Sequence, residues 1–209
     1  MIRILIADDH AVVRQGIRQI LALDPDLAVV DEAADGWQLI EKLRNCDCEL
    51  LLTDLSMPGP SGLALLERVR KERPGLPLLV LSIHGESQIV VRAIKSGADG
   101  YVTKDSEPGI LLAAVRLVAG GGHFVSPALA QKLVFESAVA GSPPSERLSD
   151  REYEIFLLIV QGRRLNEIAD SLHLSPKTIS THKQRIMRKL GVESAAALVR
   201  YAIEHGLAT

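Results

Sequence analysis

Long apolar runs, cysteines and internal repeats are scarce or absent in this sequence, and each absence excludes a class of protein. No segment approaches the roughly 18 consecutive apolar residues of a membrane span, so we expect no membrane partner. The apolar N-terminal residues give way to Asp8 and Asp9 too early for a signal peptide, which predicts a cytoplasmic protein. Cys46 and Cys48 have no companions at metal-ligand spacing, so neither a zinc site nor a disulfide framework is expected.

The composition is that of a globular protein with two differently charged parts. The 209 residues are 47% hydrophobic and 24% charged, which leaves room for one large domain or two modest ones. The net charge of −2 conceals an asymmetry. Residues 1–146 contain 14 Lys and Arg against 19 Asp and Glu, whereas residues 147–209 contain 10 against 7. The basic part is therefore a candidate for contact with a polyanion.

The first 120 residues alternate between apolar strands and amphipathic helices. Strands are predicted at about 2–7, 27–33, 49–53, 77–82 and 99–103. Helices are predicted at about 10–22, 35–44, 61–71, 86–96 and 107–119, with Ser61 as a plausible N-cap. This alternation predicts an α/β fold with a doubly wound, five-stranded parallel sheet.

A glycine-rich break leads into a second, all-helical part. Gly120, Gly121 and Gly122 interrupt the alternation, a short helix follows at about 126–136, and residues 140–145 read as a flexible linker. Four short helices are predicted beyond it, at about 150–161, 166–172, 176–189 and 194–205. We therefore divide the chain into domains at 1–122 and 147–209, joined by a linker at 123–146.

Reactive side chains stand at the carboxyl ends of four predicted strands: Asp8 and Asp9, Asp54, Ser82, and Lys104. Ligands of open α/β sheets bind at this edge. Three carboxylates there would repel one another, and their hard oxygen atoms suit Mg²⁺, which also binds phosphate oxygens. We infer phosphoryl transfer onto the carboxylate of Asp54, with Mg²⁺ and Lys104 neutralising charge. Each residue alone has a structural explanation, such as helix capping or turn formation, so only the joint pattern favours the site.

This pattern resembles the receiver domain of two-component response regulators over about residues 1–120. The resemblance is carried by Asp8-Asp9, Thr53-Asp54-Leu55-Ser56-Met57-Pro58-Gly59, Ser82 and Tyr101-Val102-Thr103-Lys104. It implies a flavodoxin-like or CheY-like fold and phosphorylation of Asp54 by a sensor histidine kinase. Mg²⁺ would be bound by Asp9, Asp54 and the backbone carbonyl of Ser56, with Asp8 assisting through water.

The same resemblance implies further roles around the phosphoryl group. Ser82 and Lys104 would contact it, and Tyr101 would turn inward as Ser82 moves, although a half-buried strand tyrosine is the structural alternative. Ser56 and His84 flank the site and are expected to influence the lifetime of the aspartyl phosphate. Asp105 replaces the proline of many receivers, so no cis-proline is expected after Lys104.

Residues 176–189 predict a basic helix within a helix-turn-helix. They contain five Lys and Arg and no acid, and Ile179, Ile186 and Leu190 repeat on one face. Pro176 suits the first helical position after a Ser175 cap. A basic helix alone is usually a solvated face, but the short turn after the preceding helix favours entry into a DNA major groove.

The C-terminal part resembles the LuxR-type DNA-binding domain, and with the receiver it resembles the NarL/FixJ family. The matching segments are Leu148-Ser149-Asp150-Arg151-Glu152-Tyr153-Glu154, Glu167-Ile168-Ala169, Leu174-Ser175-Pro176-Lys177-Thr178-Ile179 and Lys189-Leu190-Gly191-Val192. By this resemblance Ser180, Thr181 and Gln184 face base edges, helped by Lys183. The remaining contacts, mostly to phosphates, are Lys177, Thr178, His182, Arg188 and Lys189.

Two features of this part stay open. Arg164, Leu165 and Asn166 replace the usual Ser or Thr cap, Asn and Lys, so the family's DNA-backbone contact there is not carried over. The last helix, with Ala195, Leu198, Val199 and Ala202, resembles a dimerisation helix, but packing within its own bundle is the alternative.

The sequence thus predicts a transcription regulator and not an enzyme. Phosphate on Asp54 would shift the receiver, promote homodimer formation and free the helix-turn-helix to bind double-stranded promoter DNA. Two alternatives remain. One is a regulator with the same DNA-binding domain controlled by protein contacts. The other is an aspartyl-phosphate hydrolase, which usually has a second acid where Ser56 stands.

Overall fold

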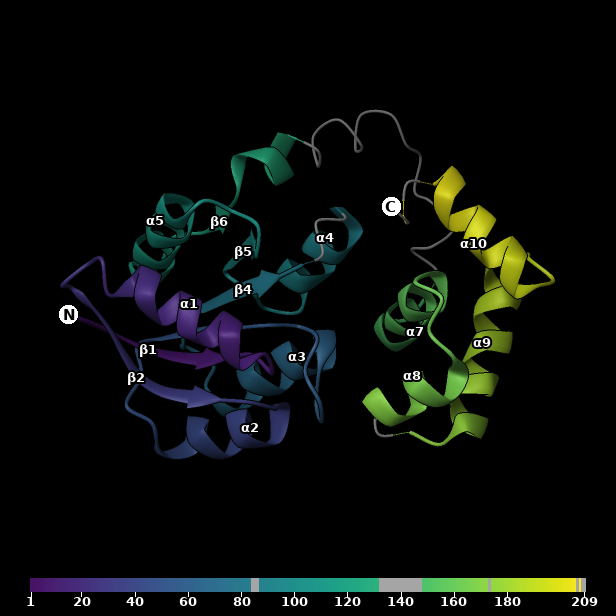
Figure 1. The fold of residues 1–209 in the computed structure, drawn as a ribbon, viewed down its shortest axis with the longest axis horizontal. Helices are drawn as coiled ribbons and strands as arrows, with labels where there is room; N and C mark the ends of the chain where they lie inside the picture. Colours follow the sequence, from purple (N-terminus) through teal and green to yellow (C-terminus); the bar gives the residue numbers. More distant parts are fainter. Residues whose placement is uncertain (84–86, 132–147, 173, 206, 208–209) are drawn as a thin grey trace. The chain divides into compact units, whose positions relative to one another are not determined.

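The computed structural model describes residues 1–83, 87–131, 148–172, 174–205 and 207 of the chain. Its internal contacts divide the chain into two units, Met1–Glu136 and Ser137–Thr209 (Figure 1). Residues 127–131 are helical, in the region of the predicted short helix. The rest of that helix and the predicted flexible linker lie outside the described residues. No helix in the described part of the chain is long and apolar enough to cross a membrane.

The first unit is built on a parallel sheet in the order β2-β1-β3-β4-β5-β6. Its strands are β1 (Ile2–Ala7), β2 (Leu27–Ala33), β3 (Leu50–Thr53), β4 (Leu78–Ser82), β5 (Gly100–Thr103) and β6 (Phe124–Val125). The predicted doubly wound parallel sheet is confirmed, but the predicted count of five strands is one too low. The missed β6 has only two residues, which pair with Gly100 and Tyr101, so no alternation could reveal it.

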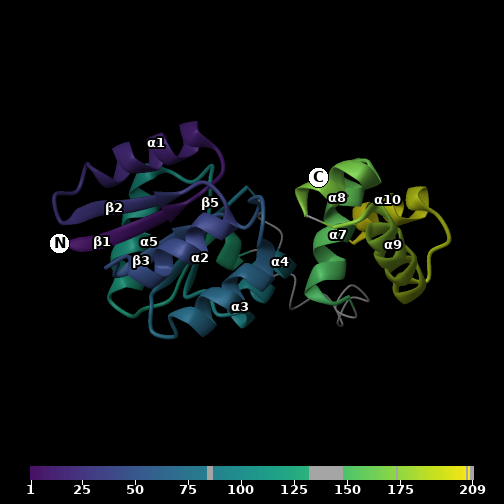
Figure 2. The same cartoon turned by 90° about the horizontal axis from the view of Figure 1, so that it is seen from below.

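Helices cover both faces of this sheet. They are α1 (Ala11–Leu21), α2 (Gly36–Asn45), α3 (Gly62–Glu72), α4 (Ser87–Lys95) and α5 (Pro108–Ala119). Helix α1 contacts α5, while α3 contacts both α2 and α4, and Figures 1 and 2 show α2 and α3 on the side of the sheet opposite α5. All residues of β3 and β4 are buried, as expected for central strands covered on both faces. A large part of the core lies between these strands and the apolar sides of α1 and α5.

The loop after β3 is held by the start of α2. The amide of Gly36 donates a hydrogen bond to the carbonyl of Pro58 at 2.9 Å. Gly59 has a φ of +83°, and the ring of Trp37 packs so closely on it that a β-carbon there would lie 2.7 Å from Cδ1. The guanidinium carbon of Arg68 lies 5.7 Å from the centre of the same ring. Helix α2 therefore supports the loop that follows Asp54.

The second unit consists of four helices around a small apolar core. They are α7 (Asp150–Val160), α8 (Leu165–Ser171), α9 (Pro176–Leu190) and α10 (Ala195–Glu204). Helix α9 contacts α7 and α8, and α10 contacts α7. In the core, Phe156 has its ring 6.0 Å from that of Tyr153 and 6.4 Å from that of Tyr201. The predicted four-helix unit is confirmed.

Serine side chains cap three of these four helices. Ser175 accepts a hydrogen bond from the Thr178 amide and Ser194 accepts one from the Ala197 amide, each at 3.1 Å. Ser149 and Glu152 form a reciprocal capping box at the start of α7. The Ser175 cap places the start of α9 at Pro176, as the sequence predicted.

Candidate functional site

Backbone hydrogen bonds between strands bring the predicted reactive residues to one edge of the sheet. The amide of Asp54 donates to the Ala7 carbonyl at 2.8 Å, and the amide of Asp8 donates to the Ala33 carbonyl at 3.1 Å. The amide of Lys104 donates to the carbonyl of Ser82 at 2.9 Å. Because all these strands are parallel, their carboxyl ends share this edge.

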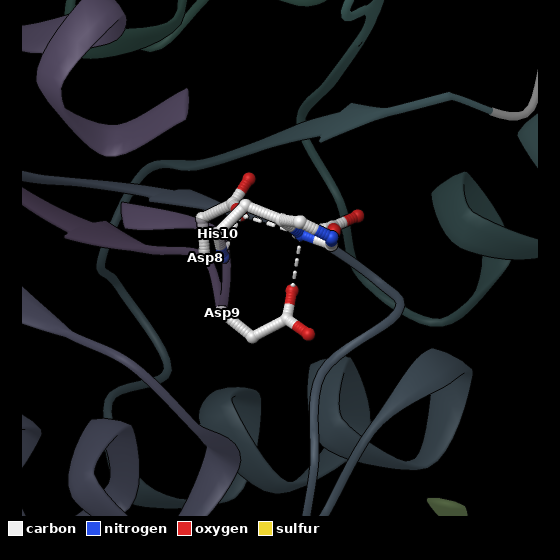
Figure 3. Close-up of side chains that lie close together, drawn as sticks. Asp8, Asp9 and His10 are labelled. Atoms are coloured by element: carbon white, nitrogen blue, oxygen red, sulfur yellow. Dashed lines mark hydrogen bonds and ion pairs between the residues drawn. The ribbon is translucent and has the colours of Figure 1, made fainter. Parts of the chain in front are cut away.

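Three carboxylates and one imidazole converge there. Asp8, Asp9, His10 and Asp54 each place one potential ligand atom within 4.8 Å of the others. The side chains of Asp8 and Asp54 are only 2% and 3% exposed. Figure 3 shows the ring of His10 beside the two neighbouring aspartates, with its Nδ1 2.8 Å from Oδ1 of Asp9. The cluster therefore concentrates negative charge, with Asp8 and Asp54 buried and Asp9 and His10 more exposed.

Lys104 offsets part of this charge. Its Nζ lies 2.6 Å from Oδ2 of Asp8 and 2.7 Å from Oδ2 of Asp54. Burial favours the neutral amine and lowers the pKa of Lys104, but the hydrogen bonds and charges of Asp54 and Asp8 outweigh this and raise the pKa above its ordinary value. The ammonium is thus charged at neutral pH and is placed beside the carboxylate that sequence reasoning singled out.

The donor set fits Mg²⁺. Oδ1 of Asp54 is buried and has no hydrogen-bond partner among the described residues, so it is an available oxygen ligand. Asp9 and Asp54 offer hard oxygen atoms at the same edge of the sheet, and one ammonium cannot neutralise three carboxylates. A divalent cation that keeps several waters would relieve the remaining repulsion.

Three other residues of the first unit that were predicted to surround the phosphoryl group lie in a strand of the sheet or in the loop after one. Ser82 ends β4 and is fully buried, with Thr103 as its register partner in β5. Tyr101 lies two positions earlier in β5 and is also fully buried. Ser56 is exposed in the loop after β3. His84 lies outside the described residues.

Helices α8 and α9 form the predicted helix-turn-helix, and four of the nine predicted DNA-contact residues on α9 are exposed while five are partly buried. Its apolar side chains Ile179, Ile186 and Leu190 are buried against the rest of the unit. Exposed residues from the predicted set are Lys177, Thr181, Gln184 and Arg188. Partly buried ones are Thr178, Ser180, His182, Lys183 and Lys189. Arg185 is also exposed on α9 and was not predicted, although it follows Thr181 by one helical turn.

Two of these residues have structural surroundings that the sequence did not reveal. Nζ of Lys189 donates to Oε2 of Glu152 at 2.5 Å, so this ammonium joins the end of α9 to the capping box of α7. Burial lowers the pKa of His182, and the charges of Arg185 and Arg151 lower it further against the opposing effect of Glu152. His182 is therefore favoured in its neutral form.

The structure explains how α8 begins without the usual cap and what the apolar residues of α10 contact. Oε2 of Glu167 accepts a hydrogen bond from the Arg164 amide at 3.0 Å, so α8 begins without a Ser or Thr cap. In α10, Leu198 and Ala202 are fully buried within the unit. Their main role is thus packing in their own bundle, whereas Ala195 and Val199 remain partly exposed.

Sequence reasoning also missed Arg14 and His10. Nη1 of Arg14 donates to the backbone carbonyl of Asp8 at 2.6 Å, and His10 contributes its ring to the acidic cluster. Only the position of His10 directly after Asp8-Asp9 could have indicated its role. Arg14 acts on a backbone atom, which leaves no signature in a pattern of side chains.

Both parts of the chain match known protein families. Residues 4–116 match the response regulator receiver domain. Residues 146–202 match the luxR family of bacterial regulatory proteins.

Full-length relatives and solved structures match as well. The chain is 37% identical to the response regulator GacA of Pseudomonas protegens over 208 residues, or 99% of this chain and 98% of GacA. It is similar to the structure of RcsB from Salmonella typhimurium, with a TM-score of 0.79 and 32% identity over 100% of this chain and 98% of RcsB. RcsB bound to promoter rprA in the presence of phosphomimetic BeF3⁻ gives a TM-score of 0.72 and 33% identity, covering 96% and 97% of the two chains.

Proposed function

The chain belongs to the NarL/FixJ-type response regulators, which join a receiver domain to a luxR-family DNA-binding domain, and we propose that phosphorylation of Asp54 controls its binding to promoter DNA. The family is one of transcription regulators and not of enzymes, as the sequence predicted. The observation that carries the proposal is the cluster of Asp9 with the buried carboxylates of Asp8 and Asp54, with Lys104 against the buried pair.

The proposed reaction is transfer of a phosphoryl group from a sensor histidine kinase to Asp54. A carboxylate oxygen of Asp54 forms a bond to phosphorus while the bond from phosphorus to the kinase histidine breaks. The histidine ring takes up one proton from solvent, which leaves an aspartyl phosphate and a neutral imidazole. Lys104, already held beside Asp54 and Asp8, pairs with an oxygen of the incoming group. Bound Mg²⁺ would be held by Asp9, Asp54 and the carbonyl of Ser56, with Asp8 acting through water, and would supply the remaining charge neutralisation.

Ser82 and Tyr101 are proposed to carry the signal away from Asp54. Ser82 ends the strand next to β3 at the same edge, and it would contact the phosphoryl group. Tyr101 on the adjacent strand would adjust as Ser82 moves. The phosphorylated receiver would then form a homodimer and release the helix-turn-helix, a shift between two populated states.

The proposed target is double-stranded promoter DNA, which makes the cytoplasm the expected location. The RcsB structure with promoter rprA supports this target, because that protein matches nearly the whole chain. Ser180, Thr181, Lys183 and Gln184 would read base edges from α9. Contacts that mainly set the register on phosphates would come from Lys177, Thr178, His182, Arg188 and Lys189.

Labelling with a small phosphodonor tests the phosphoacceptor directly. With acetyl phosphate and Mg²⁺, the wild-type chain should gain one hydroxylamine-labile phosphate, and Asp54→Ala should gain none because the proposed acceptor carboxylate is absent. Asp105→Asn, which changes an exposed carboxyl beside Lys104, should be labelled like the wild type. Undiminished labelling of Asp54→Ala, measured by mass spectrometry of the intact protein, would contradict the proposal.

A further inference from the structure

Arg14 links the loop after β1 to strand β2. Its Nη1 donates to the carbonyl oxygen of Asp8 at 2.6 Å, and its Nε donates to Oε2 of Glu32 at 3.2 Å. The side chain of Arg14 is only 17% exposed, so this planar guanidinium is enclosed between its two acceptors. Arg14 therefore reaches the acidic cluster through the backbone rather than through a carboxylate of the cluster.

This contact completes the restraint on the peptide that joins Asp8 to Asp9. The amide of Asp8 donates a hydrogen bond to the Ala33 carbonyl. The side chain of Asp8 accepts a hydrogen bond from the His10 amide at 2.8 Å. Because a peptide unit is planar, a hydrogen bond to the Asp8 carbonyl also fixes the direction in which the chain enters Asp9. Both aspartates depend on this geometry to point their carboxylates toward Asp54.

We propose that Arg14 is a positioning residue for the Mg²⁺ ligands, and that Glu32 holds Arg14 in place. The inference rests on the proposed function, since it assigns Arg14 to the metal site of that function. Loss of a group that orients metal ligands typically lowers metal affinity by about 10-fold to 100-fold. Arg14 should matter in the same way, although it touches no metal itself.

Removing Arg14 has two effects on Mg²⁺ affinity that are opposite in sign, one from the lost charge and one from the lost hydrogen bond. A variant of Arg18 separates these two effects. Loss of a positive charge near three carboxylates would by itself strengthen cation binding. Arg18 places its Nη2 2.5 Å from Oε1 of Glu32, the other oxygen of the same carboxylate, and its side chain is 57% exposed. Arg18→Met therefore removes the same charge from the same partner while leaving the hydrogen bond from Arg14 to Asp8 intact.

The test measures binding of magnesium chloride alone to the full-length chain, without any phosphodonor. The thermal unfolding midpoint of the first unit is followed by calorimetry as Mg²⁺ is raised, because a ligand of the folded state stabilises it according to its affinity. Arg14→Met and Arg14→Lys should both need about 10-fold more Mg²⁺ for the same stabilisation. The lysine keeps the charge but cannot present two fixed donors to both acceptors. Arg18→Met should respond to Mg²⁺ like the wild type or at slightly lower concentration.

The outcomes distinguish a metal-positioning role from a purely structural one. If Arg14 only stabilises the fold, its variants will have a lower midpoint without Mg²⁺ and an unchanged Mg²⁺ dependence, which overturns the inference. An equal shift in Arg18→Met overturns it as well, because that variant keeps the hydrogen bond from Arg14 to Asp8, which would then not explain the effect. A wild-type chain that Mg²⁺ does not stabilise contradicts the metal site of the proposed function, and the role of Arg14 with it.

Discussion

At the scale of single residues, a lysine in each unit contacts a buried carboxylate. Lys104 contacts Asp8 and Asp54, while Lys189 contacts Glu152, whose side chain is only 5% exposed. Removing one partner of such a pair leaves a buried charge without compensation, which costs more than the pair contributes when intact. Lys104 thus belongs to the proposed phosphoacceptor site, and Lys189 joins the end of α9 to the start of α7.

The Glu152 and Lys189 pair makes the stability of the helical unit dependent on pH. Burial raises the pKa of Glu152, but hydrogen bonds from Lys189 and Ser149 outweigh it and leave the pKa below its ordinary value of 4.5. The unfolded chain therefore takes up a proton before the folded chain does, so this stabilisation is complete above about pH 4.5 and is lost as the pH falls through the lower folded value. Glu152→Gln should destabilise the helical unit by about 1–3 kcal/mol at pH 7, and by progressively less toward pH 3.

Calorimetry of the full-length chain between pH 7 and pH 3 checks this expectation. Glu193→Gln changes an exposed carboxyl of the same unit and should leave the profile of the wild type unchanged. A stability difference between wild type and Glu152→Gln that stays constant across this range would show that the carboxylate charge is not responsible.

Residues whose chemistry depends on order along the chain were predictable, and contacts between packed elements were not. The order of Asp8-Asp9, Asp54, Ser82 and Lys104 on successive parallel strands is enough to bring them to one edge. The spacing of Ser149 and Glu152 is also a readable capping signature. The contacts made by Arg14 and Lys189 join elements whose packing the sequence pattern does not specify.

At the scale of elements, the start of α2 is matched to the loop after β3. A β-carbon on Gly36 would lie 1.8 Å from the carbonyl oxygen of Pro60, so only glycine allows this approach. The same loop carries Ser56, whose carbonyl is a proposed metal ligand. The fit of α2 against the loop therefore supports both the fold and the proposed site.

Alanine at two glycines should have opposite effects on the first unit. Gly36→Ala should lower the free energy of unfolding by about 1–3 kcal/mol, because the backbone must shift to accept the new atom. Gly16 lies inside α1, and a β-carbon there would meet nothing within 4 Å, so Gly16→Ala should raise stability by about 0.5–1 kcal/mol. Urea unfolding followed by circular dichroism measures both. Equal stability of Gly36→Ala and wild type would show that the loop adapts without cost.

Elements with a clear apolar period were predictable, and short ones were not. The central strands β3 and β4 are continuous apolar runs, and the longer helices carry apolar residues at helical spacing, so both appear in the sequence. Strand β6 is formed because Phe124 and Val125 can extend an existing edge next to β5. Pairing with a neighbour, rather than any local preference, creates that strand.

At the scale of the whole molecule, the two units divide chemistry and recognition between them. The first carries the acidic cluster and an excess of acidic residues, and the second carries the basic helix α9 and an excess of basic ones. A phosphoryl group fits the first and a polyanionic duplex fits the second. The central claim is that phosphate on Asp54 governs the DNA affinity of the second unit.

Sequencing of genomic fragments bound by the purified full-length chain tests this claim most directly. Wild type and Asp54→Ala are each incubated with fragmented genomic DNA and Mg²⁺, with and without acetyl phosphate, at equal protein concentration. We expect acetyl phosphate to enrich a defined set of promoter fragments with the wild type and to have no effect with Asp54→Ala. Equal enrichment of the same fragments by Asp54→Ala would contradict the account and favour a regulator controlled by protein contacts.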